Sequence, residues 1–223
     1  MKKTFAAMTA ALLMIALFSS TAFAKPAGSG NVIPGQWSVW NVNADRTAYV
    51  ATNLTASGFK FLSTPVTAML TTSTTKSLLG DLTGKTITAT FTINASAGAT
   101  FAHDYGDPSC TTPASAHLYF AGNNGAGPNG PWYSNFWFSN PLATTLVSAV
   151  GNTVTLSVPI TSDSQQWSDW NGEMASDVPG YFAAAAASVD VIGLTFGGCG
   201  FLNGVGMSAG SASFVLSSYS VTP

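Results

Sequence analysis

Charged side chains are scarce in this sequence. They make up 7% of its 223 residues, against about 25% in an average soluble protein. The formal net charge at pH 7 is −2, so nucleic acids and anionic membranes are not expected partners. The chain is still predicted to fold, because 46% of its residues are hydrophobic and the low-hydrophobicity, high-charge composition of disordered proteins is absent.

Histidine is also scarce, and the residues of familiar catalytic sites are incomplete. Two histidines are too few for a clustered catalytic metal site, and the G-x-S-x-G pattern of a serine nucleophile is missing. Glu173 with Asp169 or Asp177 would offer two carboxylates, but all three lie in one loop rather than on adjacent strands, as a glycosidase pair would. Whether the protein is an enzyme stays open, and a non-catalytic protein is the favoured interpretation.

Only two cysteines are present, Cys110 and Cys199. In an oxidising compartment two cysteines most simply form one disulfide. The bond would close a loop of about 90 residues and stabilise the fold by roughly 4 kcal/mol in the chain-entropy model. The alternative is a reactive thiol or a metal ligand.

Long apolar runs are absent after the first 24 residues, so no membrane span is expected. The first 24 residues have the form of a secretory signal peptide: Lys2 and Lys3, an apolar run over residues 5–18, and the small-x-small site Ala22-Phe23-Ala24. Cleavage would leave a secreted or periplasmic protein that begins at Lys25. We expect a loose Gly/Pro-rich arm over residues 25–36 and one β-sandwich domain over residues 37–223.

Alternating apolar and polar residues predict an all-β fold. The clearest case is residues 85–93, where Ile87 and Phe91 share a face with other apolar residues while every second position is Thr. We interpret this Thr face as a solvent-facing sheet surface; ordering water against ice is the alternative. The remaining strands are expected over residues 37–42, 47–53, 58–62, 65–71, 99–105, 153–160, 190–196 and 211–221.

This strand spacing favours an antiparallel β-sandwich of the jelly-roll type, with a closed barrel as the alternative. Five consecutive alanines follow Pro179-Gly180 and predict a short helix over residues 181–188, because Ala is the strongest helix former. No other helix is expected.

An aromatic hairpin over residues 115–140 is the most informative segment. Its first strand places Leu118 and Phe120 on one face and His117 and Tyr119 on the other. In its second strand, alternation predicts that Trp132, Phe136 and Phe138 face the core, and that Tyr133, Asn135 and Trp137 face outward. The outward face would combine aromatic rings with amide and imidazole groups.

Such a face suits carbohydrate, because a sugar ring stacks on a flat aromatic face and its hydroxyls pair with polar groups. Trp167 and Trp170, in a polar loop over residues 162–180, form a second aromatic group. These aromatics would otherwise pack beneath loops or against the sheet. The candidate ligand-binding residues are His117, Tyr119, Tyr133, Asn135, Trp137, Trp167 and Trp170.

Two turns are candidate calcium sites, since Ca²⁺ prefers carboxylate and carbonyl oxygens. One contains Asp45, and the other contains Asp104 and Asp107. Ordinary turn chemistry explains Asp and Asn at such positions equally well. No other cofactor is expected.

The segment Leu-Leu-Gly-Asp-Leu-Thr-Gly-Lys-Thr-Ile, residues 78–87, resembles the start of a strand in bacterial secreted jelly-roll domains of the laminin-B and galactose-binding-like group. The order of the later elements is also similar, so the resemblance covers roughly residues 37–221. It implies an antiparallel jelly roll, carbohydrate binding and, in some members, a structural calcium ion. It implies no catalytic residues.

Two functions follow from these observations. The first is a secreted carbohydrate-binding protein that uses the aromatic face to bind a polysaccharide or surface glycan. The second is a structural or adhesive surface protein in which the same face contacts another protein chain, including a copy of itself.

Overall fold

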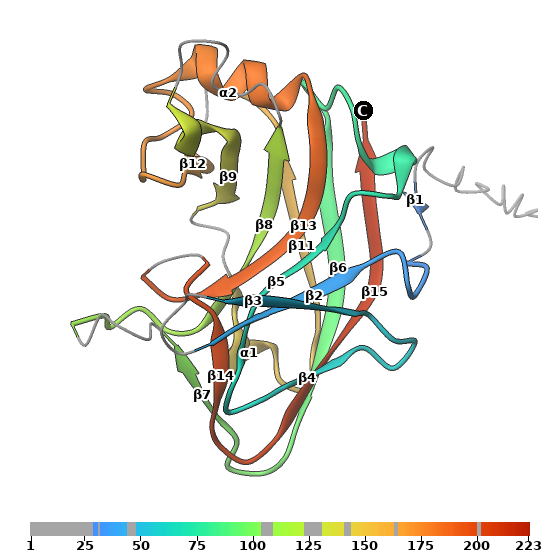
Figure 1. The fold of residues 1–223 in the computed structure, drawn as a ribbon, viewed down its shortest axis with the longest axis vertical. Coiled ribbons are helices and arrows are strands. Elements are labelled where there is room, and N and C mark those ends of the chain that lie inside the picture. Colours follow the sequence, from blue (N-terminus) through green and yellow to red (C-terminus); the bar gives the residue numbers. More distant parts are fainter. Residues whose placement is uncertain are drawn as a thin grey trace, which may run out of the picture.

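The computed structural model (Figure 1) describes residues 29–30, 32–43, 48–103, 109–122, 131–140, 144–162, 165–199 and 202–223. In these segments two antiparallel sheets pack face to face and enclose one large hydrophobic cluster. The predicted all-β antiparallel sandwich is therefore confirmed. The expected signal peptide, residues 1–24, lies outside the described residues.

The smaller sheet has five strands. Strand β15 pairs with β1, β4 and β6, and β6 pairs in turn with β11. Because β1 pairs with β15, this part of the expected loose arm is attached to the sheet. The strands are β1 (Ser29–Gly30), β4 (Phe59–Phe61), β6 (Thr86–Ala95), β11 (Thr153–Pro159) and β15 (Ala212–Thr222).

The larger sheet has ten strands in the order β12-β9-β8-β13-β5-β14-β7; in addition, β2 pairs with β5 and β3, and β10 pairs with β8. Its strands are β2 (Ser38–Val42), β3 (Tyr49–Asn53), β5 (Val66–Thr72), β7 (Thr100–His103), β8 (Ser115–Gly122), β9 (Phe136–Ser139), β10 (Thr144–Thr145), β12 (Trp167–Asp169), β13 (Val189–Gly197) and β14 (Val205–Ala209). The strands predicted from alternation are present with ends shifted by one or two residues, except the second strand of the aromatic hairpin, which begins only at Phe136.

The core lies between the sheets and is built from alternate residues of each strand. In β6, Ile87 and Phe91 are fully buried, whereas the Thr residues between them are partly exposed, as predicted. From the other sheet, Leu118 and Phe120 of β8 enter the same cluster. Alternation alone therefore identifies which side of these two strands faces the core between the sheets.

The predicted helix near residues 181–188 is α2 (Pro179–Ala186). It begins with Pro, which the first turn of a helix tolerates, and its Phe182 packs on Trp137 with ring centroids 4.8 Å apart. Gly122 of the sheet allows α2 to approach closely, because a Cβ there would clash with the carbonyl of Ala185. The expectation of a single helix is wrong: α1 (Leu146–Ala149) is a second α-helix, and η1 (Lys76–Leu78) and η3 (Trp132–Asn135) are 3₁₀ helices.

The predicted disulfide is present between Cys110 and Cys199, whose Cα atoms are 5.7 Å apart. It joins the segment before β8 to the connection between β13 and β14. A bond across 89 positions of sequence restricts the unfolded chain strongly. It also fixes one side of the groove described next.

Candidate functional site

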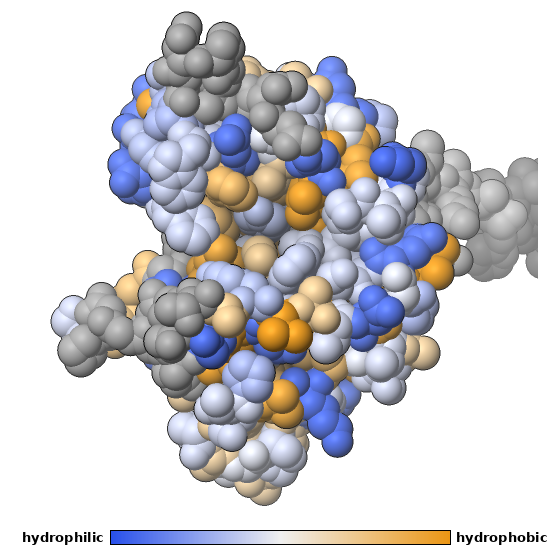
Figure 2. Space-filling model, viewed as in Figure 1, coloured by the Kyte–Doolittle hydropathy of each residue, from blue (hydrophilic) through white to orange (hydrophobic). Residues whose placement is uncertain are grey.

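A groove crosses the outer face of the ten-stranded sheet, the face turned away from the core. Its first part is a hollow of about 530 Å³ beside β9 and β12, lined by Phe138, Trp170 and Leu202 together with polar residues. Figure 2 shows this face hollowed next to β9 and β12, with hydrophobic residues exposed inside the hollow. Cys199 also lines it, so the disulfide holds this wall in place.

The second part is a hollow of about 270 Å³ over β2, β5 and β13. Trp40, Met69 and Tyr119 supply its apolar surface, and Gln36 and Thr71 supply polar groups. The Trp40 indole donates a hydrogen bond from Nε1 to Thr71 Oγ1 (2.9 Å). This bond holds the partly exposed ring over the neighbouring strand.

The two hollows share an apolar floor. Tyr119 from the second hollow lies against Phe138 from the first, with ring centroids 5.3 Å apart. Met69, Val191 and Leu202 pack against the same cluster. The hollows therefore lie next to each other over one apolar cluster, and together they are called the groove.

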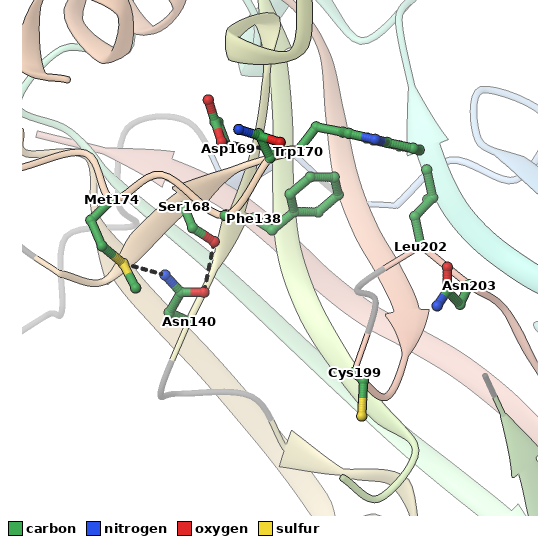
Figure 3. Close-up of a pocket in the computed structure, with 11 residues that line it drawn as sticks. Phe138, Asn140, Ser168, Asp169, Trp170, Met174, Cys199, Leu202 and Asn203 are labelled. Atoms are coloured by element: carbon green, nitrogen blue, oxygen red, sulfur yellow. Dashed lines mark hydrogen bonds between the residues drawn. The ribbon is translucent and has the colours of Figure 1, made fainter. Parts of the chain in front are cut away.

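An aromatic series leads from this floor to the rim. The Trp170 ring lies 6.2 Å from Phe138, 6.1 Å from Phe136 and 6.0 Å from Trp132, measured between centroids. Phe138 is 2% exposed, whereas Trp170 is 45% and Trp132 is 62% exposed. In Figure 3 the Trp170 side chain extends past Phe138 toward Leu202. The rim thus presents two large aromatic surfaces to solvent.

Hydrogen bonds fix the loop that carries Trp170. Asp169 Oδ1 accepts from the backbone N–H of Asn171 (2.9 Å) and of Glu173 (3.0 Å), and Asp169 Oδ2 accepts from Ser134 Oγ (2.9 Å). The carboxylate is 2% exposed and is therefore a structural acceptor. Its three bonds hold the turn that follows β12 and so position the indole.

Asn140 brings amide groups to the same hollow (Figure 3). Its Oδ1 accepts from Ser168 Oγ (2.9 Å), and its Nδ2 donates to Met174 Sδ (3.3 Å). Asn171 and Asn203 also line the hollow. Oriented amides beside an indole form a surface that pairs with uncharged hydroxyl groups.

Two of the expected ligand-binding residues lie in the core. Trp137 and Trp167 are both fully buried. Trp137 Nε1 donates to the carbonyl oxygen of Ser134, and Trp167 Nε1 donates to that of Pro159, each at 2.8 Å. The expectation that Trp137 faces outward is wrong, and the candidate Trp167 packs in the core.

The physical reason is the register of β9. The segment over residues 132–135 forms η3, so strand alternation does not extend through it. Tyr119 pairs with Phe138, and Phe120 pairs with Trp137, and paired residues share a face. Phe136 and Phe138, expected in the core, therefore lie on the outer side, and Trp137 lies inside.

The other expected residues divide between buried positions and the surface. His117 and Tyr119 are on the outer side of β8, as predicted, but are only 3% and 4% exposed. Burial lowers the pKa of His117 to about 4, and it raises the pKa of Tyr119 with a smaller contribution from the Asp190 carboxylate. His117 Nδ1 lies 2.7 Å from the carbonyl oxygen of Ser139 and carries the proton, because a carbonyl only accepts.

Tyr133, Asn135 and Trp170 have exposed surface. The pKa of Tyr133 is raised, by desolvation first and then by the Glu173 and Asp169 carboxylates. Of the predicted residues, Tyr119 and Trp170 line the groove. The structure does not place Tyr133 and Asn135 in its lining.

Sequence reasoning missed Trp40, Met69, Phe138 and Leu202 as groove residues. A signal for Trp40 was present: Trp37 and Val39 are buried in the core, so Ser38 and Trp40 had to face outward. Leu202 carried no such signal, because it lies in the connection before β14.

The calcium candidates Asp45, Asp104 and Asp107 lie outside the described residues. Among the residues that are described, no three His, Cys, Asp or Glu side chains group as metal ligands would. Asp169 is the one charged side chain among the described residues that line the two hollows. The groove is thus almost uncharged.

Comparison with protein-family models, curated proteins and solved structures found no match to this chain. In the described segments no helix is long and apolar enough to cross a membrane. Function is therefore inferred from the groove and its lining residues.

Proposed function

We propose that this protein is a secreted, non-catalytic β-sandwich that binds carbohydrate in the groove on its ten-stranded sheet. The observation that carries the proposal is the half-exposed Trp170 indole, which continues through Phe138 into the apolar floor. The expected signal peptide and the Cys110–Cys199 disulfide support secretion, since disulfides persist in oxidising compartments.

The composition of the groove suits a sugar. Binding sites for small ligands combine apolar and aromatic surface with a few placed polar groups. Here Trp170 and Trp40 offer flat faces for the C–H side of a sugar ring, while Asn140 and Asn203 offer amides for its hydroxyls. The resemblance to laminin-B and galactose-binding-like domains points to the same ligand class.

A hydrolytic role has less support. Glycoside hydrolysis needs two carboxylates about 5–10 Å apart on opposite sides of the bond that is cleaved. Asp169 is the one carboxylate in the described lining, and all three of its hydrogen bonds serve the turn around Trp170. Binding without catalysis is the function that these residues support best.

Retention on insoluble polysaccharides and affinity electrophoresis in soluble ones test the proposal. We expect the wild-type protein to bind at least one polysaccharide and Trp170→Ala to bind at least about tenfold more weakly, as for other central aromatic anchors. Tyr49→Ala is the matched control, because Tyr49 is 42% exposed on β3 and lines neither hollow. Wild-type protein that binds none, or a Trp170→Ala variant that binds as wild type does, would overturn the proposal.

Sedimentation over a concentration range checks the alternative, in which this face joins two copies of the chain. Carbohydrate binding predicts a monomer, or an oligomer that still binds polysaccharide. A dimer that dissociates when Trp170 is replaced, and that polysaccharide does not affect, favours the structural or adhesive role instead.

A further inference from the structure

One row of paired residues runs the whole width of the groove, at right angles to the strands. Its members come from six strands, β2, β5, β13, β8, β9 and β12: Ser38, Thr71, Gly193, Tyr119, Phe138 and Ser168. Neighbouring strands lie about 4.8 Å apart, so this row is roughly 24 Å long. That length exceeds a disaccharide.

The middle of the row has no side chain, because Gly193 occupies it. This residue pairs with Thr71 on one side and with Tyr119 on the other. A Cβ at Gly193 would clash with the carbonyl oxygen of Leu70, so the close approach of β5 and β13 keeps the position free of a side chain. The row therefore carries no side chain between Thr71 and Tyr119.

An indole stands near each end of the row. Trp170 follows Asp169 at the β12 end, and Trp40 lies two residues from Ser38 at the β2 end. Trp40 belongs to the second hollow and Trp170 to the first. Two separated indoles over one apolar floor match several rings of one polysaccharide chain better than a single sugar.

The charge of the lining restricts the chemistry of that chain. The described residues of both hollows include no Lys or Arg, so a polysaccharide that carries carboxylate or sulfate groups would lose hydration without gaining a partner. Hydroxyl groups, in contrast, can pair with the Asn, Gln, Ser and Thr side chains that line the groove.

From these observations we infer that the two hollows are subsites of one extended site, which takes several consecutive sugars of an unbranched, uncharged polysaccharide lying across the strands. The inference rests on the proposed carbohydrate function. It adds three properties of the ligand: a minimum length, a direction across the strands and the absence of charge. It also assigns Trp40 and Trp170 to different subsites of the same site.

Calorimetry with neutral oligosaccharides of increasing length tests the inference, with the series prepared from whichever polysaccharide retains the wild-type protein. Affinity should rise at least tenfold from the disaccharide to the hexasaccharide. Trp40→Ala should remove most of that rise, whereas Trp170→Ala should weaken binding at both lengths. An acidic polysaccharide should bind at least tenfold more weakly than a neutral one.

A second variant guards against a folding defect in Trp40→Ala. Ser38→Arg removes no side chain from the core and places a bulky cation on the floor of the second hollow, so it should give the same loss for long ligands. Affinity that does not depend on length, or Trp40→Ala and Ser38→Arg variants that bind the hexasaccharide normally, would overturn the extended site and leave the proposed function standing. Wild-type protein that binds no polysaccharide would overturn both.

Discussion

The two sheets of this sandwich have outer faces of opposite character. On the five-stranded sheet, Thr88 pairs with Ser157 and Thr90 with Thr155 through their hydroxyls, at 2.9 and 3.0 Å. On the ten-stranded sheet, Tyr119 and Phe138 line a groove whose rim carries the exposed Trp170. One face satisfies its own polar groups, and the other leaves aromatic surface in water.

The difference indicates which face has a partner. Cross-strand hydroxyl pairs are complete within the protein and stabilise a sheet modestly. Exposed contiguous apolar surface is unfavourable in water and marks a binding site in soluble proteins. The low charge of the chain is common to both faces, so it does not distinguish them; the aromatic residues do.

The largest effect is expected for an aromatic residue on the inner side of the same sheet. Trp137→Ala should lower the free energy of unfolding by about 3–5 kcal/mol, because it leaves a cavity beside Phe182 and also removes the hydrogen bond to the Ser134 carbonyl. Urea unfolding measures the change. Polysaccharide affinity of the folded variant should stay near the wild-type value.

Trp170→Ala is the matched control for Trp137→Ala. Its ring is 45% exposed, so the loss of stability should be less than about 1 kcal/mol, while binding is weakened. If Trp137→Ala is well tolerated, or if Trp170→Ala is the more destabilising of the two, the assignment of inner and outer faces in β9 is wrong.

A pH-dependent change of about 3 kcal/mol in the free energy of unfolding is expected from His117, which is buried in the ten-stranded sheet. The pKa of His117 falls from 6.5 to about 4 on folding, mainly through burial. The unfolded chain therefore binds the proton more readily. The stability that neutral His117 contributes is complete above pH 6.5 and is lost as pH falls toward 4, at about 1.4 kcal/mol per pH unit.

Unfolding free energies at pH 7 and pH 4 check this value. The wild-type protein should lose about 3 kcal/mol more than His117→Gln over this range, because the carboxylates that also titrate are common to both proteins. Equal losses would show that folding does not shift the pKa of His117. Groove variants such as Trp170→Ala should keep the wild-type pH dependence.

The sequence predicted those features that depend on local pattern. Strict alternation in residues 85–93 identified the buried side of β6, and five alanines after Pro179 identified α2. The two cysteines predicted the disulfide because no other pairing exists. In each case the prediction needs only a short segment of the sequence or the number of cysteines.

Prediction of the groove would have required contacts between residues that are distant in sequence. Alternation in residues 131–140 was misread because η3 interrupts the strand, so the true register comes from pairing with β8. Trp167 and Trp170 are three residues apart, and no local pattern shows that the first is fully buried while the second is half exposed. The second hollow also joins β2 to β8, which are distant in sequence.

The smallest effect is expected on the hydroxyl face. Replacing Thr90 and Thr155 with Ala, singly and together, should give a coupling free energy of about 0.2–1 kcal/mol for this cross-strand pair, measured by urea unfolding as a double-mutant cycle. Polysaccharide affinity should not change, because both residues lie on the sheet opposite the groove. If the Thr90 variant binds polysaccharide more weakly, the hydroxyl face contributes to recognition and the contrast between the two faces fails. If affinity is unchanged while the cycle shows coupling, the Thr pairs stabilise the sheet, and binding belongs to the aromatic face.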